Sequence, residues 1–137
     1  MTARCFVDTN ILVYAASTKS GDREKTKKAL AVLARGDIGF SAQVIQEFYV
    51  VATGKQYLQI PGKNVSAIID ILSDYPIVPI TKELVLAAIE LKNRRQISYW
   101  DAAILAAAHV GGAEVLFSED LGHGQVYDGV LVQNPFL

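Results

Sequence analysis

Short β-rich runs alternate along the chain with longer helical patterns, and no other feature of the sequence limits the fold as strongly. Strands that are separated by helices pair in parallel, because the helix supplies the long crossover connection that a parallel pair needs. The predicted strands are residues 4–7, 38–41, 77–80, 114–117 and 130–133. The predicted helices cover residues 11–17, 23–36, 42–54, 81–95 and 98–112, with one more between Pro61 and Pro76. We therefore expect an α/β fold on a mainly parallel sheet, formed as one domain over residues 1–137.

The composition excludes several classes of protein. The 137 residues are 51% hydrophobic and 20% charged, which is typical of a globular protein. A formal net charge of -1 gives no overall basic field, so any binding of nucleic acid must depend on local patches. A lone cysteine, Cys5, excludes an internal disulfide and a cysteine-rich zinc site. Because no stretch approaches the ~18 apolar residues of a membrane span, we expect a soluble, cytoplasmic protein.

Four carboxylates stand at places where plain surface charge is not expected. Asp8 follows the first predicted strand, Asp120 follows the fourth, and Asp101 lies at the start of the most apolar helix. Glu47 has valines three and four residues away on its predicted helix, so its carboxylate should be partly buried, which costs free energy without a partner. In parallel α/β sheets, the carboxyl ends of the strands and the helices that start there line the ligand crevice. The four acids could therefore converge on one site.

Three of these acids also have a purely structural explanation, and the residues alone leave both explanations open. Asp8 is suited to cap the helix that follows it or to form a turn. Ser98 and Asp101 fit the S-x-x-D capping box, in which the acid bonds back to the cap residue. Asp120 lies beside Glu119 in a loop that contains glycine, where aspartate commonly forms turns.

Acids that are gathered in one site repel one another and raise one another's pKa unless cations neutralise them. Hard divalent ions with oxygen ligands meet that need, so the pattern indicates Mg²⁺ or Mn²⁺ as the cofactor. The residues for other common chemistries are missing. His109 and His123 do not have zinc-ligand spacing, and the sequence contains no glycine-rich phosphate loop and no G-x-S-x-G elbow.

Four segments carry a family resemblance: "FVDTNILVYA", "SAQVIQEFYVV", "SYWDAAILAAA" and "LFSEDLGHGQVYDGVLVQNPF". In this order they resemble the PIN-domain family, and in particular the VapC-like toxins of bacterial toxin–antitoxin pairs. The resemblance covers essentially the whole chain and implies a three-layer α/β/α sandwich. It also implies that the catalytic, metal-binding acids are Asp8, Glu47, Asp101 and Asp120. Because the last acid varies in the family, the adjacent Glu119 is the alternative to Asp120.

Three polar residues beside the acids also match positions of the family. Thr9 and Asn10 follow the first aspartate, and Ser118 precedes the last acid. By the resemblance, these groups orient carboxylates or water. Asn10 could instead cap the first short helix.

The resemblance implies metal-dependent endonucleolytic cleavage of RNA. One or two ions would activate a water molecule for in-line attack on phosphorus, with no protein nucleophile. An acidic site cannot attract a polyanion, so flanking cations must bind the phosphates, and an aromatic side chain could stack on an unpaired base. The candidate RNA contacts are Lys25, Lys28, Arg94, Arg95 and Tyr99.

The resemblance also implies protein partners, namely a second copy of the chain in a homodimer and a cognate antitoxin that blocks the site. Two related alternatives remain: an RNA-processing PIN nuclease without an antitoxin, and an inactive PIN-like binding module. A different class, the haloacid-dehalogenase-like phosphatases, also has an aspartate after its first strand. These enzymes typically place a second aspartate two residues on, where this chain has Asn10.

Overall fold

A six-stranded sheet forms the centre of the computed structural model, which describes residues 3–54 and 56–137. The strands are β1 (Cys5–Val7), β2 (Ile38–Ser41), β3 (Ile77–Val78), β4 (Val115–Phe117), β5 (Val126–Tyr127) and β6 (Val130–Gln133). They lie in the order β3-β2-β1-β4-β6-β5, and every neighbouring pair is parallel except β5 and β6. The predicted α/β fold on a mainly parallel sheet is confirmed.

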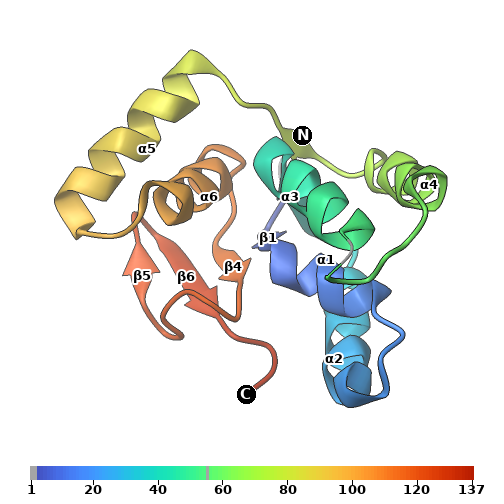
Figure 1. The fold of residues 1–137 in the computed structure, drawn as a ribbon. Coiled ribbons are helices and arrows are strands. Elements are labelled where there is room, and N and C mark those ends of the chain that lie inside the picture. The colour runs from blue at the N-terminus through green and yellow to red at the C-terminus, as the bar shows by residue number, and fades with distance from the viewer. Residues whose placement is uncertain (1–2, 55) are drawn as a thin grey trace.

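Helices cover both sides of the strands. They are α1 (Thr9–Ala16), α2 (Arg23–Leu33), α3 (Ala42–Thr53), α4 (Gly62–Leu72), α5 (Lys82–Arg95) and α6 (Tyr99–Val110), with a short 3-10 turn, η1 (Ser20–Asp22), before α2. Figure 1 shows α5 and α6 on one side of the strands and α1 to α4 gathered on the other, as the predicted α/β/α sandwich requires. No helix in the described part of the chain is long and apolar enough to cross a membrane.

The core is packed around the sheet and α6. β1 is buried along its whole length, and every residue of α6 from Ala102 to Ala108 is buried too. Most of these α6 residues are alanines, whose small side chains let the helix pack closely on the sheet. A Cβ at Gly111, just past the end of α6, would collide with the Phe6 ring, so a glycine is needed there. The most apolar segment of the sequence thus forms the buried helix α6.

One strand was missed in the sequence. β5 is short, and its Val126 side chain is exposed, so it gives no apolar pattern. It forms a hairpin with β6 through Asp128 and Gly129, which both have positive φ angles (49 and 83°). An Asp-Gly pair between apolar residues is a strong hairpin signal, and it is present in "VYDGVLV". The signal is present in the sequence, whereas the predicted elements leave residues 126–129 unassigned.

The register between β1 and β4 positions the candidate site. Val7 lies beside Phe117 in this parallel pair, so the residues that follow them, Asp8 and Ser118, emerge side by side at the carboxyl edge of the sheet. The backbone N–H of Asp8 donates a hydrogen bond to the carbonyl of Phe117 (2.8 Å). Side chains that are 110 residues apart in sequence are thereby brought into contact.

Candidate active site

Asp8 is the most enclosed acid of the molecule. The residue is only 6% exposed, and both of its side-chain oxygens accept hydrogen bonds. The backbone N–H of Thr9 donates to Oδ1 (2.7 Å), and the Ser118 hydroxyl donates to Oδ2 (2.7 Å). Asp8 is also the N-cap residue of α1. The structural and functional explanations of Asp8 are therefore compatible, because one carboxylate caps the helix and faces the other acids.

Burial raises the pKa of Asp8 from 3.8 to about 6. Loss of hydration is the largest cause, and the two hydrogen bonds from Ser118 and Thr9 oppose it. The negative charges of Asp120 and Glu47 raise the pKa further, which shows that these acids lie close enough to repel Asp8. A buried carboxylate with a raised pKa among other acids is characteristic of a functional site.

Two hydrogen bonds tie Glu47 and Asp120 to the start of α1. The Thr9 hydroxyl donates to Glu47 Oε1 on α3 (2.9 Å), so this polar residue beside Asp8 holds a second acid. The Asn10 amide nitrogen donates to Asp120 Oδ2 (3.1 Å). Thr9 and Asn10 thus each orient a carboxylate, and Asn10 does not form the cap of α1, which Asp8 provides.

The turn after β4 is arranged around the Ser118 hydroxyl, which is fully buried. Its Oγ accepts hydrogen bonds from the backbone N–H groups of Asp120 (3.2 Å) and Leu121 (3.3 Å) while it donates to Asp8. Asn10 Oδ1 accepts from the backbone N–H of Glu119 (3.4 Å). The turn therefore presents Asp120 to the site in a fixed relation to Asp8.

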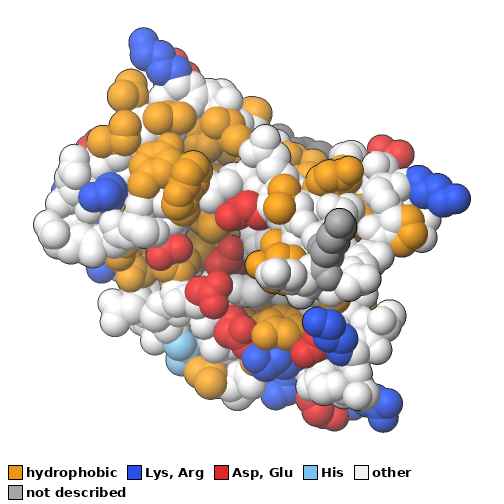
Figure 2. Space-filling view, in the orientation of Figure 1, with side chains coloured by type: hydrophobic (Ala, Val, Ile, Leu, Met, Phe, Trp, Pro, Cys, Tyr) orange, Lys and Arg blue, Asp and Glu red, His pale blue; other side chains and the backbone are white. Residues whose placement is uncertain are grey.

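Asp101 is held differently. It stands in the first turn of α6, where its backbone N–H donates to the hydroxyl of Ser98, the N-cap (3.1 Å). In the described chain the backbone N–H of Ser98 donates no hydrogen bond to the Asp101 carboxylate, so only half of the predicted capping box forms. The carboxylate is half-buried and is left available. Figure 2 shows acidic side chains in a row across the middle of the molecular face, between α5 and α6 on one side and α3 on the other.

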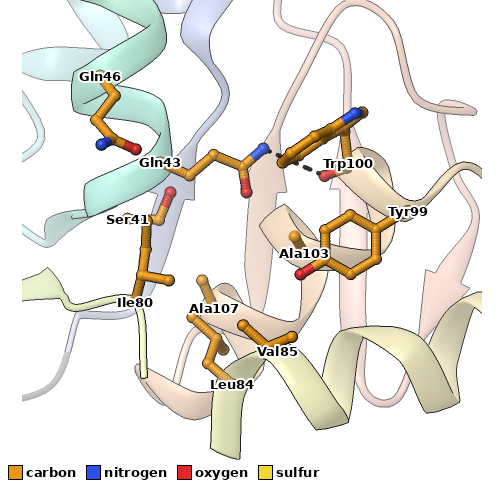
Figure 3. A pocket seen from close by; sticks show the side chains of 10 residues that line it. All are labelled: Ser41, Gln43, Gln46, Ile80, Leu84, Val85, Tyr99, Trp100, Ala103 and Ala107. Carbon is orange, nitrogen blue, oxygen red and sulfur yellow. Dashed lines mark hydrogen bonds between the residues drawn. The ribbon is translucent and has the colours of Figure 1, made fainter. Parts of the chain in front are cut away.

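A small pocket of about 70 Å³ lies between α3, α5 and α6, beside the start of α6 (Figure 3). The Gln43 amide crosses its mouth and donates to the backbone carbonyl of Trp100 (3.4 Å). Tyr99 and Trp100 pack edge to face, with ring centroids 5.1 Å apart, and Trp100 is 65% exposed. Gln43, which sequence reasoning did not single out, thus links α3, which carries Glu47, to the segment that carries Asp101.

The predicted RNA contacts on α2 and α5 engage other parts of the chain. Lys28 donates to the carbonyl of Phe136 (3.4 Å), and Lys25 binds Glu119 and Tyr14. In a second group, the Arg94 guanidinium pairs with Asp128 (2.9 Å), and Arg95 donates to the carbonyl of Val126 and lies over the Tyr127 ring. Figure 2 shows basic side chains gathered over α2, next to one end of the acidic row.

The side chains of the site fit a hard divalent ion by their chemistry. Asp120 and Glu47 each offer carboxylate oxygens within electrostatic reach of Asp8. Among the residues that the structure describes, no group of three or more His, Cys, Asp or Glu side chains is arranged so that it could hold a metal ion. Mg²⁺ does not require three such ligands, because it commonly binds to one or two carboxylates and keeps several water molecules. A bound cation would offset both causes that raise the pKa of Asp8, which are first its burial and then its repulsion by Asp120 and Glu47.

Fold and site together define an α/β/α protein with acids collected at the carboxyl edge of a parallel sheet. The sequence matches the PIN domain family over residues 5–129, and the chain belongs to this family of nucleases. The resemblance that was inferred from the sequence is confirmed. No curated protein sequence matches the chain at a significant level.

Several solved structures have a similar fold. A chain from a toxin–antitoxin complex of Klebsiella pneumoniae is 26% identical, with a TM-score of 0.68, over 96% of this chain and 97% of that chain. VapC20 of Mycobacterium tuberculosis, a toxin that cleaves the sarcin-ricin loop, is 18% identical over 85% of this chain and 91% of that one, with a TM-score of 0.66. FitAcB from Neisseria gonorrhoeae is 18% identical over 96% and 98%, with a TM-score of 0.63. At these identities, the last two structures support the fold alone.

Proposed function

We propose that this protein is a Mg²⁺- or Mn²⁺-dependent endoribonuclease that acts in the cytoplasm as the toxin of a toxin–antitoxin pair. One observation carries the proposal: Asp8 is buried, both of its oxygens are fixed by hydrogen bonds, and Glu47 and Asp120 raise its pKa. The fold gains nothing from repulsion between acids, so a cationic ligand is the simplest reason for keeping them together.

The residues of the site have two roles, as ligands of the ion and as groups that hold those ligands in place. Asp8, Glu47, Asp101 and Asp120 would hold the ion, which would supply positive charge and activate a water molecule for attack on a phosphodiester. Thr9 and Asn10 hold Glu47 and Asp120 by the hydrogen bonds described above, and Ser118 holds Asp8. These three groups keep the carboxylates aimed in the absence of the ion, which lowers the cost of assembling the site.

Binding of RNA requires positive charge near the acids. The basic side chains over α2 adjoin the acidic row, and Lys28 is an exposed member of that helix. Tyr99 and the exposed Trp100 lie beside the start of α6, where they could stack on an unpaired base. Both features suit a single-stranded segment of RNA.

A protein partner accounts for the apolar surface. Trp100, Ile80 and Leu86 are each more than half exposed, which is costly on a surface that stays bare. The similar Klebsiella chain comes from a toxin–antitoxin complex. We therefore expect a cognate antitoxin, and a homodimer of this chain, to cover part of this surface.

Cleavage of cellular RNA in vitro tests the enzymatic part. With Mg²⁺ or Mn²⁺, the purified protein should produce defined RNA ends, and EDTA should abolish them. Asp8→Asn should lose the activity while it stays folded, and Asp70→Asn, the same change at an exposed position on α4, should retain it. Full cleavage in EDTA or by Asp8→Asn would overturn the proposal.

Induced expression tests the toxin part. Wild-type protein should arrest growth, Asp8→Asn should not, and co-expression of the antitoxin should restore growth. If the purified enzyme cleaves RNA but induction leaves growth unaffected, a processing nuclease replaces the toxin. If the protein binds Mn²⁺ or a partner but cleaves nothing, it is a PIN-like binding module.

A further inference from the structure

Lys25, Tyr14, Glu119 and Phe136 form a cluster of side chains that borders the acidic site. Lys25 on α2 donates hydrogen bonds to Glu119 Oε2 and to the Tyr14 hydroxyl (3.2 Å). The Tyr14 hydroxyl donates to Glu119 Oε1 (3.0 Å). Both carboxylate oxygens of Glu119 are therefore occupied by donors from α1 and α2.

Two aromatic rings fix the position of the Lys25 ammonium. It lies 4.7 Å from the centroid of the Tyr14 ring and 5.5 Å from that of Phe136, and these two rings pack edge to face. A cation at this distance from aromatic rings is attracted to them. The hydrogen bond with Glu119 is also the main cause that raises the pKa of Lys25. The ammonium is thus held from several directions, unlike a freely moving surface lysine.

Glu119 is next to Asp120 in the turn that the Ser118 hydroxyl organises. From one side, Ser118 and Asn10 bind the backbone of this turn, as described above. From the other side, Lys25 and Tyr14 bind the Glu119 side chain. The turn that presents Asp120 is therefore clamped between the start of α1 on one side and the Lys25–Tyr14 pair on the other.

We propose that Lys25 is a positioning residue of the acidic site, which with Tyr14 binds Glu119 and fixes the 118–121 turn so that Asp120 faces Asp8. This inference rests on the proposed function, in which the acidic site binds a divalent ion. It assigns Asp120 as the fourth acid of the metal site, because the Lys25 ammonium neutralises Glu119. It also assigns Lys25 to the protein itself and not to an RNA phosphate.

Hydrogen exchange of the backbone amides in the turn tests this directly, without metal or RNA. In Lys25→Met, the amides of Glu119, Asp120 and Leu121 should exchange about three- to tenfold faster than in the wild type. Lys25→Arg keeps a donor and should restore most of the protection. Lys27→Met, an equal loss of charge on an exposed position of the same helix, should change nothing in the turn. Unchanged exchange in Lys25→Met would overturn the proposal.

A double-mutant cycle on Mn²⁺ affinity, with free Mn²⁺ counted by electron paramagnetic resonance, separates the proposal from its rivals. Lys25→Met and Glu119→Gln should each weaken Mn²⁺ binding about tenfold, and the double variant should be no weaker than either one. If Glu119 were itself a ligand, Glu119→Gln would cost much more and would add to Lys25→Met. That result would overturn the assignment of Asp120.

RNA cleavage distinguishes positioning from contact with phosphate. A positioning role predicts a lower kcat in Lys25→Met with an unchanged KM and unchanged salt dependence. Loss of a phosphate contact would instead raise KM and reduce the salt slope by about one. If the wild-type protein cleaves no RNA, the proposed function fails, while hydrogen exchange in the turn still decides the positioning role.

Discussion

Asp8 and Asp101 stand at the starts of two helices, α1 and α6, yet the chain holds them in opposite ways. Asp8 is buried, and a hydrogen bond fixes each of its oxygens. The Asp101 carboxylate is half-buried, and in the described residues it accepts no hydrogen bond. One acid is thus fixed in advance, and the other is free to adjust. We infer that Asp8 sets the place of a ligand and that Asp101 closes on it.

The largest effect should come from removing either acid. Asp101→Asn and Asp8→Asn should each lower RNA cleavage about a thousandfold or more, since an ion ligand contributes more than the outer groups that orient it. Thermal unfolding checks that each variant is folded. Cleavage by Asp101→Asn at a rate near that of the wild type would show that Asp101 is not a ligand. Its role would then be limited to the start of α6.

The next effect is on the free energy of unfolding, whose pH dependence should differ between variants of Asp8 and Asp101. The folded pKa of Asp8, about 6, is above its unfolded value of 3.8, so between pH 4 and 6 the folded state binds more protons. Unfolding free energy should therefore fall as the pH rises through this window, by up to about 3 kcal/mol. Denaturant unfolding in EDTA measures it.

The two asparagine variants provide the controls for this pH dependence. Asp8→Asn removes the titrating group and should flatten the decline between pH 4 and 6. Asp101→Asn should retain this decline, because Asp8 is the buried acid and Asp101 is only half-buried. An unchanged decline in Asp8→Asn would assign the titration to another group.

A smaller effect should come from the two serines that support these acids. Ser118→Ala removes the hydrogen bond that favours the charged form of Asp8, so the pKa of Asp8 should rise further. Mn²⁺ binding at pH 7 should then weaken about 10- to 100-fold. Ser98→Ala removes the cap of α6, and it should cost about 1 kcal/mol of stability and leave Mn²⁺ binding nearly unchanged. Equal losses of Mn²⁺ binding in both variants would contradict the comparison.

Local patterns in the sequence were enough to predict most of the fold. The helices and parallel strands follow from apolar periodicity, and the buried α6 follows from its uniform apolar run. β5 could not be recognised by periodicity, since it is too short to alternate. Its Asp-Gly turn was the signal to use.

The candidate site was predictable in its residues and not in its contacts. Asp8 and Ser118 stand out as polar groups after apolar strands, but their pairing depends on the β1–β4 register. Likewise, the sequence places Glu119 and Asp120 side by side and does not choose between them. The choice depends on Lys25 and Tyr14, which approach Glu119 from distant helices. Nothing in the sequence around Lys25 distinguishes it from other lysines on a polar helix face, so its contact with Glu119 could not be predicted.

The hydrogen bond between Ser118 and Asp8 also makes the acidic site sensitive to opening of the sheet. It joins two residues that are 110 positions apart and that meet only where β1 pairs with β4. Local separation of these two strands would free Asp8 from the hydroxyl that favours its charged form. The acidic site therefore persists only as long as the centre of the sheet stays intact.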